Sequence, residues 1–275
     1  MTPVEKGNAF KALHESGTFV LANFWNEGSA LILERLGFQA LATTSSGFAQ
    51  SLGKLDGTIT LEQTLEHCQR CAAITNVPVS ADFGNGFADD PQDTAANLLR
   101  LAATGVVGAS IEDWSGDAIY PHDLAVERIA ACAEAVNTLG FQFTLTARAD
   151  NLLHGVHELD DTINRLNAYQ DAGADVLYAP GLASTDQIQG VLEVTTKPLN
   201  VLFSFMPDTT LEEFANLGVR RISLGGALAN HATGATLSAA NRMLEDGDFT
   251  WLLDAAPGPA IKQLLRPAAL PGPEK

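Results

Sequence analysis

The most constraining feature of the sequence is an alternation of two hydrophobic patterns that repeats eight times. Short apolar runs rich in β-branched or aromatic residues predict buried strands, and the longer stretches between them have the apolar spacing of helices. The predicted strands are residues 18–24, 38–43, 77–83, 106–111, 141–147, 174–179, 198–203 and 219–224. The predicted helices are residues 29–36, 61–75, 91–104, 124–139, 159–172, 185–194, 211–217 and 227–245.

Two properties of these segments favour a closed barrel. Most of the strands carry apolar residues at successive positions, as expected where helices cover both faces of a parallel sheet. Several helices end in a glycine just before the next strand, as at Gly105 and Gly140, because glycine adopts the positive φ of a helix C-cap without steric cost. Eight strand–helix units in 275 residues are what a (β/α)8 TIM barrel of the α/β class requires.

A doubly wound open sheet is the alternative architecture. The one glycine cluster that resembles a dinucleotide-binding fingerprint, Gly84-x-Gly86, lacks the third glycine and follows the third strand instead of the first. We therefore predict the barrel, over residues 1–247. Residues 248–275, with Trp251 and Leu252 followed by several prolines, are predicted to form an apolar C-terminal helix and an extended arm. This tail packs either on a neighbouring subunit or on its own barrel.

The charge balance and the cysteines restrict the setting and the partners. The chain has 16 Lys and Arg against 33 Asp and Glu, a formal charge of −17, whereas nucleic-acid binding needs clustered basic side chains. No apolar run approaches the length of a membrane span, and Glu5, Lys6 and Asn8 interrupt any signal-like stretch. Three cysteines, an odd number, are typical of a reducing compartment. We predict a cytoplasmic protein that binds small molecules and neither nucleic acid nor membranes.

The carboxyl ends of the strands are the place to search for a site, because barrel enzymes build theirs there. In chain order these ends carry Asn23, Trp25, Thr44, Ser45, Ser46, Gly47, Ser80, Asp82, Glu112, Asp113, Arg148, Asp150, Tyr178, Gly225 and Gly226. Hard divalent cations take oxygen ligands, and a guanidinium pairs with carboxylates. The set therefore predicts a metal site beside a carboxylate-binding arginine. For Glu112, a salt bridge to Arg148 is the alternative to metal binding.

Five motifs in this order and spacing resemble the isocitrate lyase and phosphoenolpyruvate mutase superfamily, over roughly residues 10–249. They are Ser45-Ser46-Gly47, Ser51-Leu52-Gly53-x-x-Asp56, Val79-Ser80-Ala81-Asp82, Gly108-Ala109-Ser110-Ile111-Glu112-Asp113 and Thr146-Ala147-Arg148-Ala149-Asp150. The resemblance implies a (β/α)8 barrel whose last helix is swapped between the subunits of a homodimer or homotetramer. It also implies Mg²⁺, a 2-oxo acid or its enolate, and the making or breaking of a C–C or P–C bond.

Carried over by position, the resemblance assigns roles to individual residues. Ser45, Ser46 and Gly47 are similar to the family's carboxylate-binding turn, which Thr44 precedes, and Trp25 at the end of the first strand completes the predicted substrate contacts. Asp56, Asp82 and Glu112 are similar to the acids that hold Mg²⁺ directly or through water. Arg148 is similar to the arginine that grips the substrate carboxylate.

The chain departs from the family pattern at three places. Pro180 stands where the lyases carry a glutamate just after the sixth strand. Ser80 stands where the family has the first acid of Asp-x-Asp, and a hydroxyl is a poorer Mg²⁺ ligand than a carboxylate. The lyase loop with Lys-Lys/Arg-Cys-Gly-His is replaced by residues 114–122, which contain no cysteine and no lysine. Besides Asp117, only Tyr120 and His122 are titratable there, so they are the candidates for the missing acid. The alternative is a loop-packing tyrosine and a histidine at a helix start.

Other potential sites in the sequence have simpler explanations. Cys68-x-x-Cys71 falls inside a predicted helix, as does Cys132, so all three thiols are predicted to be core or boundary residues. His154-x-x-His157 lacks a third metal ligand.

The resulting prediction is a homo-oligomeric, Mg²⁺-dependent lyase or decarboxylase that cleaves a C–C bond in a small 2-oxo or 2-hydroxy di- or tricarboxylic acid. One alternative is a P–C bond enzyme of the phosphoenolpyruvate mutase or phosphonate hydrolase kind, against which the sparse positive charge at the site counts. The other is a non-catalytic binder of 2-oxo acids, suggested by the lost acid loop and by Ser80.

Overall fold

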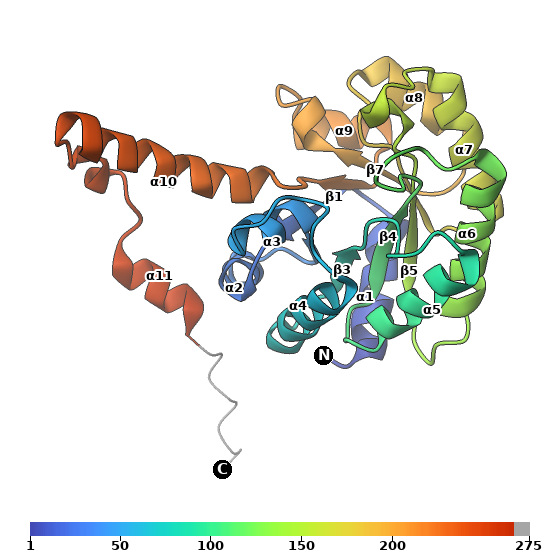
Figure 1. Cartoon of the computed structure of the whole chain (residues 1–275), viewed down its shortest axis with the longest axis horizontal. Coiled ribbons are helices and arrows are strands. Elements are labelled where there is room, and N and C mark those ends of the chain that lie inside the picture. The colour runs from blue at the N-terminus through green and yellow to red at the C-terminus, as the bar shows by residue number, and fades with distance from the viewer. Residues whose placement is uncertain (267–275) are drawn as a thin grey trace, which may run out of the picture.

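The computed structural model describes residues 1–266 and contains eight parallel strands closed into a barrel (Figure 1). The strands are β1 (Phe19–Phe24), β2 (Leu41–Thr43), β3 (Val79–Asp82), β4 (Gly108–Glu112), β5 (Thr144–Arg148), β6 (Val176–Tyr178), β7 (Leu199–Leu202) and β8 (Arg221–Ser223). Each strand pairs with the next along the chain, and β8 closes the barrel on β1, where Phe19 lies opposite Arg221. The predicted (β/α)8 barrel is confirmed.

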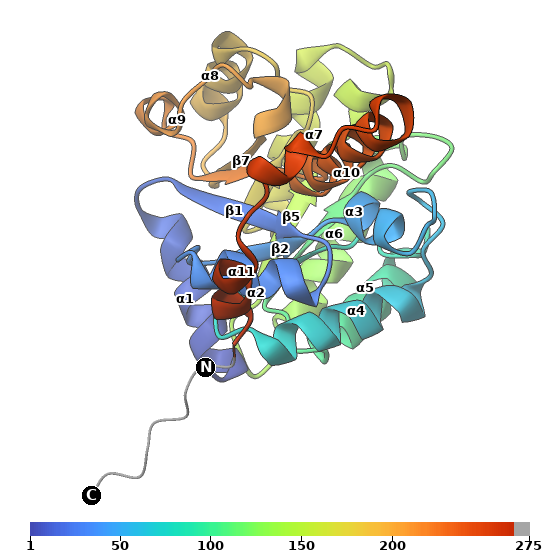
Figure 2. The same cartoon turned by 90° about the vertical axis from the view of Figure 1, so that its left-hand side faces the viewer.

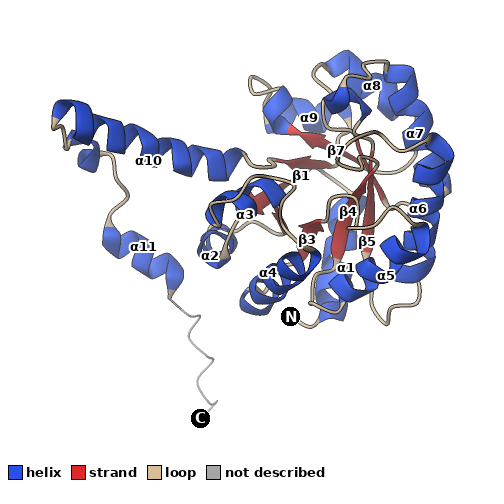
Figure 3. Ribbon diagram, viewed as in Figure 1, coloured by secondary structure: helices blue, strands red, loops and turns tan. Residues whose placement is uncertain are grey.

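Helices alternate with the strands and surround them (Figure 3). They are α1 (Pro3–Glu15), α2 (Glu27–Arg35), α3 (Ser45–Ser51), α4 (Leu61–Ile74), α5 (Pro91–Ala102), α6 (His122–Val136), α7 (Leu159–Asp171), α8 (Thr185–Val194), α9 (Leu211–Leu217), α10 (Ala227–Asp246) and α11 (Gly258–Leu265). Short 3-10 helices span Asn151–His154, Phe203–Phe205 and Thr250–Leu253. All eight predicted helices are present.

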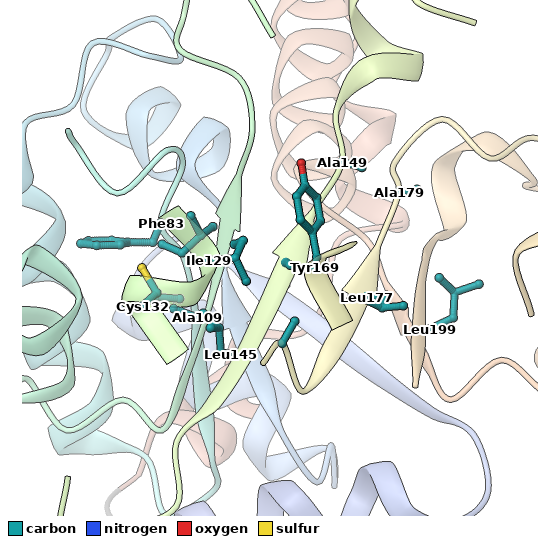
Figure 4. Packing of buried hydrophobic residues seen from close by; sticks show 14 of the residues in the cluster. Phe83, Ala109, Ile129, Cys132, Leu145, Ala149, Tyr169, Leu177, Ala179 and Leu199 are labelled. Atoms are coloured by element: carbon teal, nitrogen blue, oxygen red, sulfur yellow. The ribbon is translucent and has the colours of Figure 1, made fainter. Parts of the chain in front are cut away.

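The main hydrophobic core lies between the outside of the barrel and these helices (Figure 4). Ala109 of β4, Leu145 of β5 and Leu177 of β6 are completely buried in it, and Ile129 of α6 and Tyr169 of α7 are nearly so. Most strand residues of this core are followed in the sequence by a polar residue, and successive strand positions point to opposite sides. The strands therefore direct most of their apolar side chains toward the helices, and much of the inside of the barrel is polar.

Helix α1 is absent from the prediction. It begins with a capping box formed by Thr2 and Glu5. Its Phe10 ring packs against Gly108 at the start of β4, where an added Cβ would lie only 2.8 Å from the ring. The face that α1 buries also carries Lys6 and His14, so apolar periodicity does not reveal it. The helix closes the amino-terminal end of the barrel.

The turn predicted at Ser45-Ser46-Gly47 is the first turn of helix α3. Thr44 is its N-cap, and the Thr44 side chain accepts a hydrogen bond from the Gly47 N–H at 3.4 Å. A threonine oxygen in this position satisfies one of the donors that a helix start leaves free. The polar segment therefore starts a helix at the mouth of the barrel.

The tail differs from its predicted form. The expected apolar helix is the short 3-10 helix Thr250–Leu253, and α11 lies where an extended arm was expected. Pro257 and Pro259 are compatible with this helix because proline fits the first turn, where no N–H partner is needed. Helix α11 packs against α2 of the same chain (Figure 2). The last part of the predicted arm, residues 267–275, lies outside the described residues.

Helix α10 follows β8, but it runs away from the barrel instead of along it (Figure 1). Of its 20 residues only Ala229 is buried, whereas the Leu237 and Leu244 side chains are 61% and 85% exposed. The helix ends at Gly247, which has a φ of 64°, so the predicted boundary at 247 coincides with a helix C-cap. Within residues 1–266, no helix has the combination of length and apolar character needed to cross a bilayer.

The three cysteines are core residues, as predicted. Cys68, Cys71 and Cys132 are free and buried. Burial raises the pKa of the Cys71 and Cys132 thiols to about 12, so both stay protonated and unreactive near neutral pH.

Candidate active site

Two cavities open at the carboxyl ends of the strands. The first, which we name the inner cavity, has a volume of about 190 Å³ and extends from the mouth into the barrel between Ser45 and Arg221. The second, the outer cavity, has a volume of about 700 Å³ and lies over the loops that follow the strands. Asp82 and Arg148 line both, so the two spaces meet at these side chains.

Arg148, at the end of β5, is the centre of the site. Its Nε and Nη2 donate to the two Asp150 oxygens at 2.6 and 2.8 Å, a bidentate pair. Its Nη1 lies 3.0 Å from Glu112 Oε2 and 3.5 Å from Asp82 Oδ1. The salt bridge considered for Glu112 therefore exists, but three carboxylates share one guanidinium. Burial alone would lower the pKa of Arg148, but Asp150 and Glu112 raise it well above its ordinary value.

The carboxylates of this cluster are held in an unfavourable environment for negative charge. Burial raises the pKa of Glu112 above its ordinary value; Arg148 opposes the rise, and the neighbouring Asp150 and Asp82 add to it. Burial also raises the pKa of Asp150, again against the effect of Arg148. Additional positive charge near these oxygens would therefore favour their ionised forms.

Asp113, next to Glu112 in the chain, has a different environment. Its Oδ1 accepts a hydrogen bond from the Asp150 N–H at 2.7 Å, and its Oδ2 accepts from Arg165 at 3.0 Å and Tyr169 at 2.6 Å. The side chain is almost fully buried and lines neither the inner nor the outer cavity. Asp113 thus holds the loop that carries Asp150, whereas Glu112 faces the outer cavity.

The start of α3 forms one wall of the site. The Ser45 N–H donates to Asp82 Oδ2 at 3.0 Å, and the Thr44 and Ser46 hydroxyls lie 3.1 Å apart. Gly47 is enclosed, since a Cβ there would lie 2.7 Å from Thr44 Cγ2 and 3.0 Å from Trp25 Cβ. The close packing of Gly47 fixes the position of the two serines that precede it.

Gly47→Ala should therefore displace this wall. We expect the substitution to lower the free energy of unfolding by about 1–3 kcal/mol, the usual effect of overpacking, and to weaken binding of small carboxylates. Gly28→Ala is the matched control, because only Asn26 Oδ1, at 3.5 Å, would meet its Cβ and alanine is favoured in helices. Urea unfolding of both variants tests this, and equal stabilities would contradict it.

The structure separates the remaining predicted residues. Asp56 lines both cavities, although its side chain is exposed. Trp25 contacts Gly47 but lines neither cavity. Tyr120 is buried below the loop, where its hydroxyl donates to Asp89 and accepts from Asn85. His122 is exposed at the start of α6. Neither Tyr120 nor His122 lines the inner or the outer cavity, so we give them no catalytic role.

The carboxylates suit a metal held largely through water. In the described part of the chain no three His, Cys, Asp or Glu side chains converge closely enough to hold an ion by themselves. Mg²⁺, however, is commonly bound by one or two carboxylates and keeps several waters. Asp82 and Glu112 fit such a site because both contact Arg148 Nη1 and both face the outer cavity. Asp56 reaches the same cavity from its exposed loop.

Several residues that line the site were not predicted as site residues from the sequence. Trp114 and His154, the latter discounted there as a metal ligand, line the outer cavity and stack with ring centroids 3.6 Å apart. His67 lines the same cavity from α4, stacked on Phe48. These residues come from loops and helices, where no strand-end rule applies. Arg221 stands at the start of its strand, and the search considered only the ends.

His67 makes the fold sensitive to acid. Burial lowers its pKa to about 4, and its Nε2 has no hydrogen-bond partner among residues 1–266. Since the unfolded chain keeps an ordinary histidine pKa, it binds more protons between pH 6.5 and 4, and stability falls as the pH falls through this range.

We expect His67→Phe to remove this contribution. The wild type should lose about 3 kcal/mol more stability than the variant between pH 7 and pH 4, as measured by urea unfolding at both values. His122→Phe, at an exposed histidine, should keep the wild-type dependence on pH. Identical profiles for the wild type and His67→Phe would refute the assignment.

Comparisons with known proteins find relatives along most of the chain. The family model described as phosphoenolpyruvate phosphomutase matches residues 10–244. An oxaloacetate decarboxylase from Pseudomonas putida is 30% identical over 240 residues, 83% of this chain and 81% of that protein. A 2-methylisocitrate lyase from Salmonella typhimurium is 29% identical over 205 residues, 70% of this chain and 68% of that protein. A Burkholderia cenocepacia J2315 protein of solved structure is 47% identical, with 95% of both chains covered and a TM-score of 0.92.

Proposed function

Because the chain belongs to the phosphoenolpyruvate phosphomutase family, within the isocitrate lyase and phosphoenolpyruvate mutase superfamily, we propose that it is a Mg²⁺-dependent lyase or decarboxylase. Its substrate is a small 2-oxo or 2-hydroxy di- or tricarboxylic acid, in which it cleaves a C–C bond. Two of the relatives carry the names of a decarboxylase and a lyase for acids of this class.

The observation that carries this proposal is the charge of the cluster around Arg148. One guanidinium faces the carboxylates of Asp82, Glu112 and Asp150, so the fully ionised cluster has a net charge of −2. A divalent cation bound by Asp82 and Glu112 would balance this charge. With the cation in place, a substrate anion can approach acids that would otherwise repel it.

The chain's own residues would then bind and orient the substrate. Arg148 retains one Nη2 N–H beyond those directed at Asp150, Glu112 and Asp82, and it can donate this N–H to a substrate carboxylate. Ser45 and Ser46 line the same inner cavity. When bound, Mg²⁺ supplies positive charge where negative charge develops on the 2-oxo oxygen as the neighbouring bond breaks.

Proton NMR of the purified protein with Mg²⁺ tests the function. The panel contains oxaloacetate, isocitrate, 2-methylisocitrate, 2-oxoglutarate and phosphonopyruvate, and it records both product signals and ligand line-broadening. Turnover of a carboxylic acid that stops with chelator and in Asp82→Ala is the expected result. Cleavage of phosphonopyruvate alone would replace the proposal with a P–C bond enzyme, and broadening without turnover of any acid would replace it with a non-catalytic binder.

We further propose that the chain is a homodimer or homotetramer in which α10 packs on a neighbouring subunit. Leu237 and Leu244 on α10 are exposed in the single chain, so Leu237→Glu combined with Leu244→Glu should leave the barrel folded and reduce the mass measured by light scattering to that of a monomer. Leu211→Glu, at an exposed leucine at the start of α9, is the control that should keep the wild-type mass. An unchanged mass in the double variant would contradict the packing of α10 on a neighbour.

A further inference from the structure

The inside of the barrel below the mouth is largely polar and incompletely filled. Barrels of this type are usually packed with bulky branched side chains. Here the inner cavity of about 190 Å³ is lined by Ser80 of β3, Ser110 of β4, Asn200 of β7 and Ser223 of β8. All four side chains are small and can donate hydrogen bonds. Leu21, Ala42, Ala81 and Leu202 add apolar side chains to the lining, but no large side chain of residues 1–266 fills the space between the polar ones.

Arg221 lies at the start of β8 and lines this cavity. Its side chain is buried, and each of its three hydrogen-bond partners is a neutral group. Nε donates to Asn200 Oδ1 at 2.9 Å, Nη2 donates to Thr146 Oγ1 at 3.0 Å, and Nη1 lies 3.3 Å from His14 Nε2. Two of the five guanidinium N–H groups are left free by these contacts.

The His14 imidazole beside Arg221 is uncharged, so it neither balances nor adds to the charge of the guanidinium. Burial, together with the nearby Arg221, lowers the pKa of His14 to about 3, so the imidazole is neutral. Its Nδ1 lies 2.8 Å from the Phe10 carbonyl oxygen, which requires Nδ1 to carry the proton and leaves Nε2 to accept from Arg221. The contact is a hydrogen bond between a cation and a neutral ring.

No carboxylate among residues 1–266 lies within 4.0 Å of the Arg221 guanidinium, whereas Arg148 and Arg165 both pair with aspartates. Arg128, also buried without a carboxylate, is surrounded by the carbonyl oxygens of Asn85, Ala88 and Asp89, and the space beside it is too small for a water molecule. Of these four buried arginines, Arg221 is the one that has no carboxylate partner and also lies beside a cavity.

We propose that the inner cavity is an anion-binding subsite in which Arg221 holds a small, singly charged carboxylate or halide. A buried charge without a partner is costly, and an anion beside it recovers much of that cost. The other charged groups that line the cavity, Asp56, Asp82 and Arg148, lie at its mouth, and Asp82 is already bound by Arg148 and the Ser45 N–H. The anion has two sources. It is either a free ion or, on the proposed function, the second carboxylate of a substrate whose first is held by Arg148.

Asn200→Asp is the sharpest test, because it is isosteric and places a carboxylate at the atom that already accepts from Arg221 Nε. At constant ionic strength in sodium gluconate, whose anion is too bulky for the cavity, chloride, formate, malonate or succinate is titrated and the thermal midpoint is recorded. We expect at least one of these anions to raise the midpoint of the wild type by mass action. Asn200→Asp should have a higher midpoint in gluconate alone and an at least tenfold weaker response.

Two further variants complete the design. Arg221→Met removes the charge and should also lose the response, and Arg220→Met is the matched control, since Arg220 bonds the exposed Gly17 carbonyl oxygen instead. If Arg221→Met does not fold, Asn200→Asp still decides the question. A wild-type midpoint that none of the anions shifts, or an equal response in Asn200→Asp, would overturn the proposal.

The choice of anions distinguishes a free ion from the carboxylate of a substrate. It also tests the subsite independently of the proposed function. A response to chloride and formate identifies a free ion. A response confined to malonate and succinate, and weakened in both Arg148→Lys and Asn200→Asp, identifies the end of a dicarboxylate. Since the midpoint needs neither Mg²⁺ nor turnover, an inactive protein that responds through Arg221 would support the subsite while contradicting the lyase assignment.

Discussion

Glu112→Gln should abolish turnover while leaving the fold at least as stable as the wild type. The substitution keeps the shape of the side chain and removes one of the three negative charges that share Arg148, so repulsion within the cluster falls. It also removes one of the two carboxylates proposed to hold Mg²⁺, which should lower kcat by about a thousandfold. Kinetics over a range of Mg²⁺ concentrations and thermal unfolding measure the two effects.

Asp113→Asn is the matched control, because it makes the same change at the next residue. Asp113 accepts hydrogen bonds from Arg165, Tyr169 and the Asp150 N–H, and an amide cannot accept from all of these donors. We expect a loss of about 3–5 kcal/mol in the free energy of unfolding. The division of roles between the neighbouring acids is wrong if Glu112→Gln remains active. It is also wrong if Glu112→Gln is the variant that loses stability and Asp113→Asn is the variant that keeps its stability but loses turnover.

The strand ends were predictable because topology determines where they meet. Once eight parallel strands close, Asp82, Glu112 and Arg148 must reach the same rim, and the structure brings them together around the guanidinium. The long loops carry no such constraint. Tyr120 follows β4 closely in sequence, but its hydrogen bond to Asp89 holds it beneath the loop.

The largely polar interior of the barrel also has a signal in the sequence, which is an alternation of apolar and polar residues within several strands. Residues 79–82, 109–112 and 145–148 alternate between apolar and polar positions. We expected strands with apolar residues on both sides. The period of two instead separates the helix-covered side, with Ala109 and Leu145, from the cavity side, with Ser110 and Arg148. Arg221 belongs to the cavity side of β8, and a search confined to strand ends could not find it.

Arg148→Lys conserves the charge at the centre of the site, but it should still weaken ligand binding strongly, because Arg148 contacts three carboxylates at once. Arg148→Lys retains one positive charge, but a single ammonium group cannot make the bidentate pair with Asp150 and also reach Glu112 and Asp82. The three carboxylates would then lack a common partner, and a substrate carboxylate would lose the remaining Nη2 N–H donor. Oxalate, the smallest dicarboxylate, serves as a non-reacting probe of the proposed carboxylate site. We expect its affinity in the presence of Mg²⁺ to fall by about a hundredfold or more, and kcat/KM for the substrate to fall further.

Calorimetry with oxalate and Mg²⁺ measures the loss in Arg148→Lys directly. Arg70→Lys is the matched control, because Arg70 also pairs with two carboxylates, Glu27 and Glu66, but does so on an exposed surface, where ion pairs contribute little. It should bind oxalate as the wild type does. Wild-type affinity in Arg148→Lys would mean that the ligand is held by charge alone, and the planar guanidinium would then serve only to keep Asp150 and Glu112 in place.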